Sequence, residues 1–131
     1  MDLYNASLGM EEPETIELTM EQYEDGKIHL QSIIDCADAA KRLASNPDFA
    51  SLVMEGYLKN EPLRLAELMA SGRLNQSVFD NCAADIKAVA NFRNYLKNIT
   101  EQGAMASDEM AALEEARDEA IKAEEAMNAN S

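Results

Sequence analysis

The sequence predicts an all-α protein, and three observations lead to that prediction. Good helix formers, chiefly Ala, Leu, Met, Glu and Lys, dominate the 131 residues, whereas Val and Thr are sparse. Aromatic residues make up only 5% of the chain and Trp is absent, so the core is expected to be thin. Capping and stop signals divide the chain into helical stretches. We therefore expect a small bundle of about five helices, with a long acidic C-terminal helix and a flexible acidic N-terminal arm.

The charges are distributed in three blocks along the chain. Residues 1–25 contain eight acidic residues and no Lys or Arg, residues 105–131 contain eight acidic and two basic residues, and the segment between them is balanced. We predict an acidic arm over residues 1–18, a helical bundle over 19–104 and an acidic helix over 105–131. The net charge of −14 opposes direct binding to nucleic acid or to an anionic membrane, and it attracts basic partners.

The first helix is predicted to run from Thr19 to about Ser45. Thr19 and Gln22 have the spacing of a capping box, in which each side chain binds the backbone N–H of the other residue. Apolar residues then recur at steps of three and four, which predicts one buried face. The members of that face are Tyr23, Leu30, Ile33, Ile34, Ala37, Ala40 and Ala44.

The stretch NPDFASLVMEGYLKNEPLRL, residues 46–65, contains two similar helix-start signals. Asn46 precedes Pro47, and Asn60 precedes Glu61 and Pro62. Asn is a good N-cap, and Pro suits the first turn because its missing N–H would have no helical partner there. The residue before a proline is also disfavoured in helical geometry. The stretch therefore predicts two capped helices that form a helical corner.

Glycines and caps also predict the remaining boundaries. Gly72 is expected to end the second of these two helices, and Asn75 to cap the next one. Gly103 is expected to break or kink that helix, and Ser107 to cap a last helix over residues 108–128. The apolar stripe of this last helix is narrow and rich in Ala, which favours packing against another helix.

The sequence contains little catalytic or metal-binding chemistry. His29 is the only histidine and is expected at the surface, while Cys36 and Cys82 lack zinc-site spacing and are expected as reduced core thiols. There is no glycine-rich phosphate loop, nucleophile elbow, helical HExxH pair or twelve-residue calcium loop. The Glu-x-x-His pairs of a di-iron bundle are also missing. We predict a non-enzyme with no cofactor and no bound metal.

Neither a signal-peptide pattern nor an apolar run of membrane-spanning length occurs in the sequence. We therefore expect an intracellular protein that does not enter a membrane.

Six residues are candidates for partner binding. Arg64 and Arg93 lie in otherwise apolar stretches, where each either pairs with a carboxylate or recognises a partner. The carboxylate for Arg64 is expected to be Glu67 or Glu61. Tyr57 is either a residue at the core edge or an interface anchor, and its neighbour Gly56 is expected to let another helix pack close to the backbone. The other candidates lie on the stripe of the last helix, which is hard to bury in so small a core: Met110, Leu113 and Ile121.

Several short motifs in the sequence carry a resemblance to a known group. They begin with Asn46-Pro47-Asp48-Phe49, then Glu55-Gly56-Tyr57-Leu58, Glu61 and Arg64-Leu65. They continue with Asp85-Ile86-Lys87-Ala88-Val89, Phe92-Arg93, Tyr95-Leu96 and Ile99, followed by a Gly and a Glu-rich C-terminal helix. Over residues 30–128 the sequence resembles a group of small acidic helical proteins of tailed bacteriophages. The resemblance implies a phage protein from the virion-assembly region of the genome, and it carries over no catalytic residue.

We predict a non-enzymatic phage protein that acts through protein–protein contacts, as a minor virion component or as an assembly or scaffold-like factor. Its expected partners are phage structural proteins with basic surfaces, and the last helix favours a homo-oligomer. The expected location is the host-cell cytoplasm or the virion. The alternative is an acidic DNA mimic that inhibits a host nucleic-acid-binding enzyme or defence complex. The regular carboxylates of the last helix favour this alternative, whereas the clustering of acidic residues at the two ends opposes it.

Overall fold

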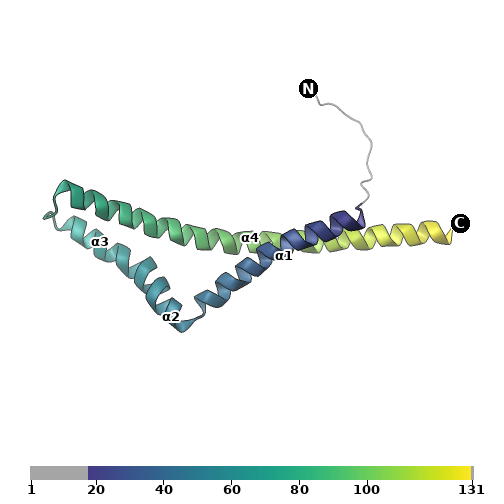
Figure 1. The fold of residues 1–131 in the computed structure, drawn as a ribbon, viewed down its shortest axis with the longest axis horizontal. Helices are drawn as coiled ribbons and strands as arrows, with labels where there is room; N and C mark the ends of the chain where they lie inside the picture. The colour runs from purple at the N-terminus through teal and green to yellow at the C-terminus, as the bar shows by residue number, and fades with distance from the viewer. Residues whose placement is uncertain (1–17, 131) are drawn as a thin grey trace, which may run out of the picture. The chain divides into compact units, whose positions relative to one another are not determined.

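The computed structural model describes residues 18–130, and 91% of them are helical, with no strand in this range. The prediction of an all-α protein is confirmed. The elements are α1 (Met20–Ala44), α2 (Pro47–Phe49), the π-helix η1 (Ala50–Asn60), α3 (Glu61–Ala70) and α4 (Gln76–Ala129), shown in Figure 1. The predicted flexible arm falls on residues 1–18, of which 1–17 lie outside the described residues.

The described chain divides into two compact units. The first unit comprises residues 18–31 and 108–130, and the second comprises residues 32–107. Within each unit, α1 packs against α4. The second unit also contains α2, η1 and α3.

The prediction of about five helices is wrong, because residues 18–130 form three. One reason is that α2, η1 and α3 follow each other from Pro47 to Ala70 without a break. Asn46 behaves as predicted: its backbone is extended, and its side chain accepts hydrogen bonds of 3.0 Å from the N–H groups of Asp48 and Phe49. Asn60 does not, because its backbone is helical and its side chain makes no capping bond. The second helix start is therefore absent.

Pro62 is accommodated inside this continuous helix by a side chain from α4. In an α-helix, the N–H of residue 62 would bind the carbonyl of Leu58, but proline has no N–H. The guanidinium of Arg93 donates a hydrogen bond to that carbonyl instead. The preceding turns are π-helical, and the N–H of Glu61 binds the carbonyl of Gly56, five residues earlier. Because the helix is already widened in this way, it continues past the proline without an interruption.

Gly56 serves this π-helix rather than a neighbouring helix. A Cβ at this position would lie 3.2 Å from the carbonyl oxygen of Ser51, which belongs to the same helix. The expectation that Gly56 allows another helix to approach is therefore wrong. Its small size relieves crowding against the carbonyl five residues back.

The second reason for the lower helix count is that α4 runs through Gly103 and Ser107 without interruption. The predicted break and the predicted cap are both wrong. Gly103 is buried, and a Cβ there would overlap the Cβ of Ala37 on α1. This glycine therefore lets α1 and α4 approach closely in the second unit, at a cost in helix propensity of about 1 kcal/mol relative to Ala.

A seven-residue repeat underlies the burial pattern of both long helices. In α1 the buried positions are Tyr23, Leu30 and Ala37. The face predicted for this helix is confirmed except at its end, where Ala44 is exposed. In α4 every seventh residue is buried or half-buried, as follows: Cys82, Val89, Leu96, Gly103, Met110 and Arg117. A repeat of seven is the pattern of helices that pack side by side along a narrow seam.

The other predicted boundaries are confirmed. Thr19 and Gln22 form the capping box, with both reciprocal bonds at 3.1 Å. Gly72 follows α3 with a positive φ of 73°, and the side chain of Asn75 accepts a 2.9 Å bond from the N–H of Val78. Local capping rules therefore locate the start of α1 and both ends of the loop before α4.

Candidate functional site

The seam of the first unit is centred on Tyr23, which is only 2% exposed. Two cations approach the ring: Lys27 Nζ is 5.7 Å and Arg117 Cζ is 5.1 Å from its centre. Such cation–π contacts contribute about 0.5–2 kcal/mol, depending on burial. Arg117 Nε is buried and has no hydrogen-bond partner among the described residues. The guanidinium of Arg117 contacts the ring of Tyr23, and it also forms an ion pair with Asp118, whose carboxylate oxygen lies 3.8 Å away.

The stripe predicted for partner binding on the last helix is divided between this seam and the surface. Met110 is buried, and Leu113 packs over Gly26, where a Cβ would come within 3.3 Å of the leucine methyl group. Ile121 is 37% exposed, and Met127, further along, is 74% exposed. The stripe is thus covered by α1 at Met110 and Leu113 and uncovered at Ile121.

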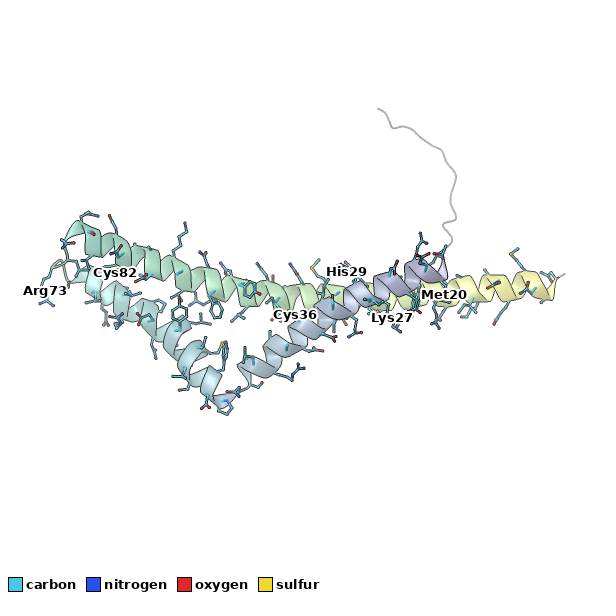
Figure 2. The ribbon with its side chains drawn as sticks, in the orientation of Figure 1. Met20, Lys27, His29, Cys36, Arg73 and Cys82 are labelled. Carbon is cyan, nitrogen blue, oxygen red and sulfur yellow. The ribbon has the colours of Figure 1, made fainter. Side chains whose placement is uncertain are left out.

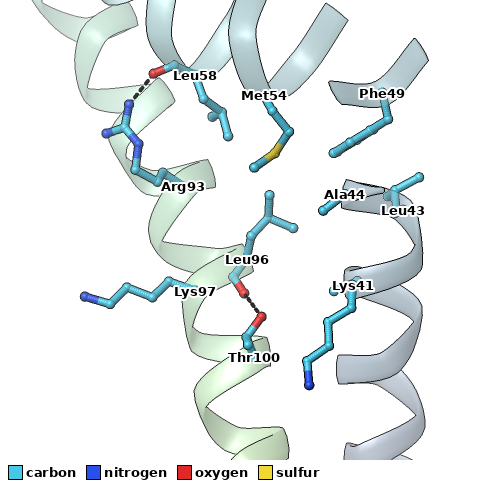
Figure 3. Close-up of a pocket in the computed structure, with 11 residues that line it drawn as sticks. Lys41, Leu43, Ala44, Phe49, Met54, Leu58, Arg93, Leu96, Lys97 and Thr100 are labelled. Atoms are coloured by element: carbon cyan, nitrogen blue, oxygen red, sulfur yellow. Dashed lines mark hydrogen bonds between the residues drawn. The ribbon is translucent and has the colours of Figure 1, made fainter. Parts of the chain in front are cut away.

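The second unit contains a cavity of about 280 Å³ between the end of α1, the helix from Pro47 to Ala70, and α4. The apolar residues that line it are Ala40, Leu43, Ala44, Phe49, Met54, Leu58 and Leu96. In Figure 3, Met54 and Leu96 point toward each other, with Phe49 and Ala44 beside them. The corner at Asn46 creates this space, because the capped helix start turns the chain away from α1.

Three cations and no carboxylate line the cavity. The cations are Lys41 from α1 and Arg93 and Lys97 from α4. Arg93 is held by the Leu58 carbonyl, and Lys97 Nζ lies 3.9 Å from a carboxylate oxygen of Glu101, outside the cavity. We name this feature the cationic cavity. It combines an apolar interior with a positive margin.

The three remaining candidates, Tyr57, Arg64 and Arg93, are not gathered at one site. Arg64 pairs with Glu61, one of its two expected partners, through bonds of 3.0 Å to Oε1 and 2.5 Å to Oε2. The hydrogen bond lowers the pKa of Glu61 and raises that of Arg64. Both groups lie at the surface, so the pair contributes little to stability.

Arg93 and Tyr57 have different environments from that of Arg64. Of the two alternatives for Arg93, pairing with a carboxylate is wrong, because its guanidinium donates to a backbone carbonyl. Recognition of a partner stays a prediction. Tyr57 is 39% exposed and makes an edge-to-face contact with Phe92, with ring centres 6.2 Å apart. Of the six predicted partner-binding residues, only Arg93 lines the cationic cavity.

Lys41, Lys97 and Met54 line the cavity but were not among the predicted site residues. Each looks like an ordinary surface residue on its own helix, and the cavity exists only because three helical segments converge. The available signal was the Asn46-Pro47 corner, since the residues on both sides of a helix corner face a common space.

The described residues give no sign of a metal site or a membrane-spanning element. Residues 18–130 contain no group of three or more His, Cys, Asp or Glu placed to hold a metal ion. None of the helices in that range is both long and apolar enough to cross a bilayer. Cys36 and Cys82 are free thiols, and Figure 2 shows both. Cys82 is buried as expected, whereas Cys36 is exposed, so its assignment to the core is wrong.

Comparison of the chain with protein-family models, curated proteins and solved structures gave no match.

Proposed function

We propose that this chain is a non-enzymatic protein of a tailed phage that acts through protein–protein contacts, as an assembly factor or a minor virion component. One observation carries the proposal. Among the described residues, large apolar side chains that are exposed outnumber the buried ones. Monomeric proteins rarely leave extended apolar surface in water unless a partner covers it.

The helix from Pro47 to Ala70 shows this exposure most clearly. It buries only Leu58 and Leu65, while it leaves Leu52 at 73% and Leu63 at 59% exposure. Met54, Tyr57 and Leu68 on the same helix are exposed as well. This helix provides the apolar part of the proposed partner surface.

The acidic residues of α4 provide the charged part. All eight carboxylates between residues 105 and 131 lie on exposed positions. They favour a partner with a basic surface, and their contribution weakens as salt is raised. An apolar contact does not weaken in this way, which separates the two contributions experimentally.

The test is affinity capture of the tagged chain from phage-infected cells at low and high salt, with proteins identified by mass spectrometry. We expect phage structural proteins that remain bound at high salt. The variant Leu52→Ser/Leu63→Ser should lose them, whereas the control Met105→Ser/Met127→Ser, which changes exposed residues of α4, should keep them.

A different result would favour the DNA-mimic alternative. In that case the captured protein is a host nucleic-acid-binding enzyme, its binding disappears at high salt, and the Leu52→Ser/Leu63→Ser variant still binds it. That outcome contradicts the proposed assembly role.

A further inference from the structure

The cationic cavity continues into a second hollow of the same unit. Three residues line both of them: Met54, Leu58 and Arg93. Together the two hollows form one open groove, which we name the long groove. On the helix from Pro47 to Ala70, its lining extends from Phe49 to Leu63, which is roughly 20 Å at the rise of a helix. An open groove of this length suits a segment of polypeptide laid along it.

The long groove is basic, although the chain as a whole is acidic. The described residues that line it include four basic and no acidic side chains: Lys41, Lys59, Arg93 and Lys97. The whole chain has 25 acidic and 11 basic residues. In Figure 3, Lys97 points away from Lys41, so we base the site on the other three cations. A segment that is both acidic and apolar complements such a groove.

The cations of the long groove retain donors for incoming carboxylates. Lys59 Nζ lies 3.8 Å from a Glu55 oxygen, and the two side chains are 66% and 64% exposed, so this pair is weak. Arg93 donates to the Leu58 carbonyl, and a guanidinium has five N–H donors. Lys41 lines the cationic cavity, whereas Lys59 lines the second hollow. Carboxylates spread along a segment therefore suit these cations better than a single carboxylate.

The chain itself contains a segment with this chemistry. Residues 11–17, EEPETIE, include four glutamates and no basic residue, and their apolar residue is Ile16. Met10 and Leu18 adjoin the segment on its two sides. Pro13 disfavours a helix there, because it lacks an N–H and restricts the residue before it. Seven extended residues span about 23 Å, which is close to the length of the long groove.

The length of α1 indicates which copy of the chain supplies the segment. Lys41 lies 21 residues after Met20 in this helix, which is about 32 Å at a rise of about 1.5 Å per residue. Glu14, in the middle of the segment, lies six residues before Met20, so the chain between them spans at most about 22 Å. The middle of the segment therefore falls short of Lys41 on its own chain and can reach Lys41 on another.

We propose that the long groove binds residues 11–17 of a second copy of this chain. The glutamates lie along the three cations, and Ile16 lies against the apolar wall at Met54. The proposal does not depend on the proposed assembly function. Leu52 does not line the long groove, so it stays uncovered when the segment is bound.

The experiment measures self-association of the purified full chain by sedimentation velocity over a range of concentrations, with no phage protein present. One variant, Glu12→Lys/Glu14→Lys, reverses two charges of the segment, and another, Lys41→Glu/Lys59→Glu, reverses two charges of the groove. Each variant alone should raise the Kd of self-association by about tenfold or more, because like charges then meet. An equimolar mixture of the two should associate again, because the segment of each variant then matches the groove of the other.

A control variant and a crosslink make the test specific. Lys87→Glu/Lys122→Glu changes two exposed lysines outside the groove lining by the same charge and should self-associate like the original chain. Circular dichroism confirms that all variants remain helical. A photoreactive benzoylphenylalanine in place of Ile16, in a mixture of ¹⁴N and ¹⁵N chains, should crosslink two different chains at the peptide that contains Met54.

Three results would overturn the proposal. The first is a chain that stays monomeric at every concentration, since no second copy then supplies the segment. The second is a mixture of the two charge-reversed variants that associates no better than either variant alone. The third is a crosslink from position 16 that forms only within one chain, or only to residues 108–130, which would place the segment outside the long groove of a second copy.

Discussion

The two units of the chain pack α1 against α4 with different kinds of side chain. In the first unit, the contact uses large groups: Leu113 over Gly26, and Arg117 over the ring of Tyr23. In the second unit, Gly103 lies directly against Ala37. One seven-residue repeat therefore supports helix contacts made through large side chains and also a direct contact between a glycine and an alanine. The size of the residue at each seam position decides which of the two forms.

The largest change in stability is expected from a substitution at the contact between Gly103 and Ala37. Replacing Gly103 by Ala places a methyl group on the Cβ of Ala37, with no flexible atom to give way. We expect a loss of about 2–3 kcal/mol in the free energy of unfolding, since overpacking outweighs the gain in helix propensity. Urea denaturation followed by circular dichroism measures it.

The matched control is Gly26→Ala in the first unit. The new methyl group meets only the end of the Leu113 side chain, at 3.3 Å, and that side chain can move. We expect no loss, or a gain of up to about 1 kcal/mol from helix propensity. Equal destabilisation by both variants would contradict the distinction between the two contacts.

The second prediction concerns the two parts of the apolar stripe on α4. Leu113→Asp places a charge against α1 and should destabilise the first unit by about 2 kcal/mol. Ile121→Asp lies on an exposed part of the same helix and should leave stability within about 0.5 kcal/mol of the original. Amide hydrogen exchange resolves the effect, because protection should fall around residues 20–31 only for Leu113→Asp. Loss of protection throughout residues 32–107 would show that the two units unfold together.

A third and smaller difference is expected between the two similar asparagines. Asn46→Ala removes two hydrogen bonds to backbone N–H groups and should cost about 1 kcal/mol. Asn60→Ala removes no cap and introduces a better helix former, so it should not lower the stability of the fold. Thermal unfolding of the two variants tests whether the helix truly continues through Asn60. If Asn60→Ala lowers the stability as much as Asn46→Ala does, a second helix starts at Asn60 after all.

The smallest effect is expected at the exposed pair of Glu61 and Arg64. Because the pKa of Glu61 is lowered in the folded state, the pair stabilises the fold above the ordinary carboxyl pKa of 4.5, and the contribution disappears as pH falls through the lowered value. The variant Arg64→Met should therefore be slightly less stable than the original protein at neutral pH. At about pH 2 the two proteins should be equally stable. Melting temperatures at both pH values make the comparison. A larger difference in melting temperature at about pH 2 than at neutral pH would contradict the predicted pH dependence.

The sequence predicted those features of the fold that depend on neighbouring residues in the chain. The capping box at Thr19, the cap at Asn46 and the stop at Gly72 are interactions within a few residues, so their signals are complete in the local sequence. The buried face of α1 was also predictable, because apolar spacing along one helix marks the side that packs.

Predictions failed where the deciding group comes from elsewhere in the chain. Gly103 reads as a helix breaker unless Ala37, on another helix, is known to lie against it. Pro62 reads as a helix start unless Arg93 is known to reach the Leu58 carbonyl. The cationic cavity was unpredictable for the same reason, since its lining is assembled from three segments. The apolar stretch around Arg93 marked this residue as unusual but did not show what it binds.

The separation of the seam partners along the chain has a consequence during synthesis. Ala37 is made 66 residues before Gly103, and Tyr23 is made 94 residues before Arg117. At about 5–20 residues per second, a ribosome leaves the inner face of α1 uncovered for roughly 3–19 s. A nascent chain that stops before α4 is complete presents that strip of Tyr23, Leu30 and Ala37 without its cover. We therefore expect chaperones that recognise exposed amphipathic helices to bind truncated translation products more than the complete chain.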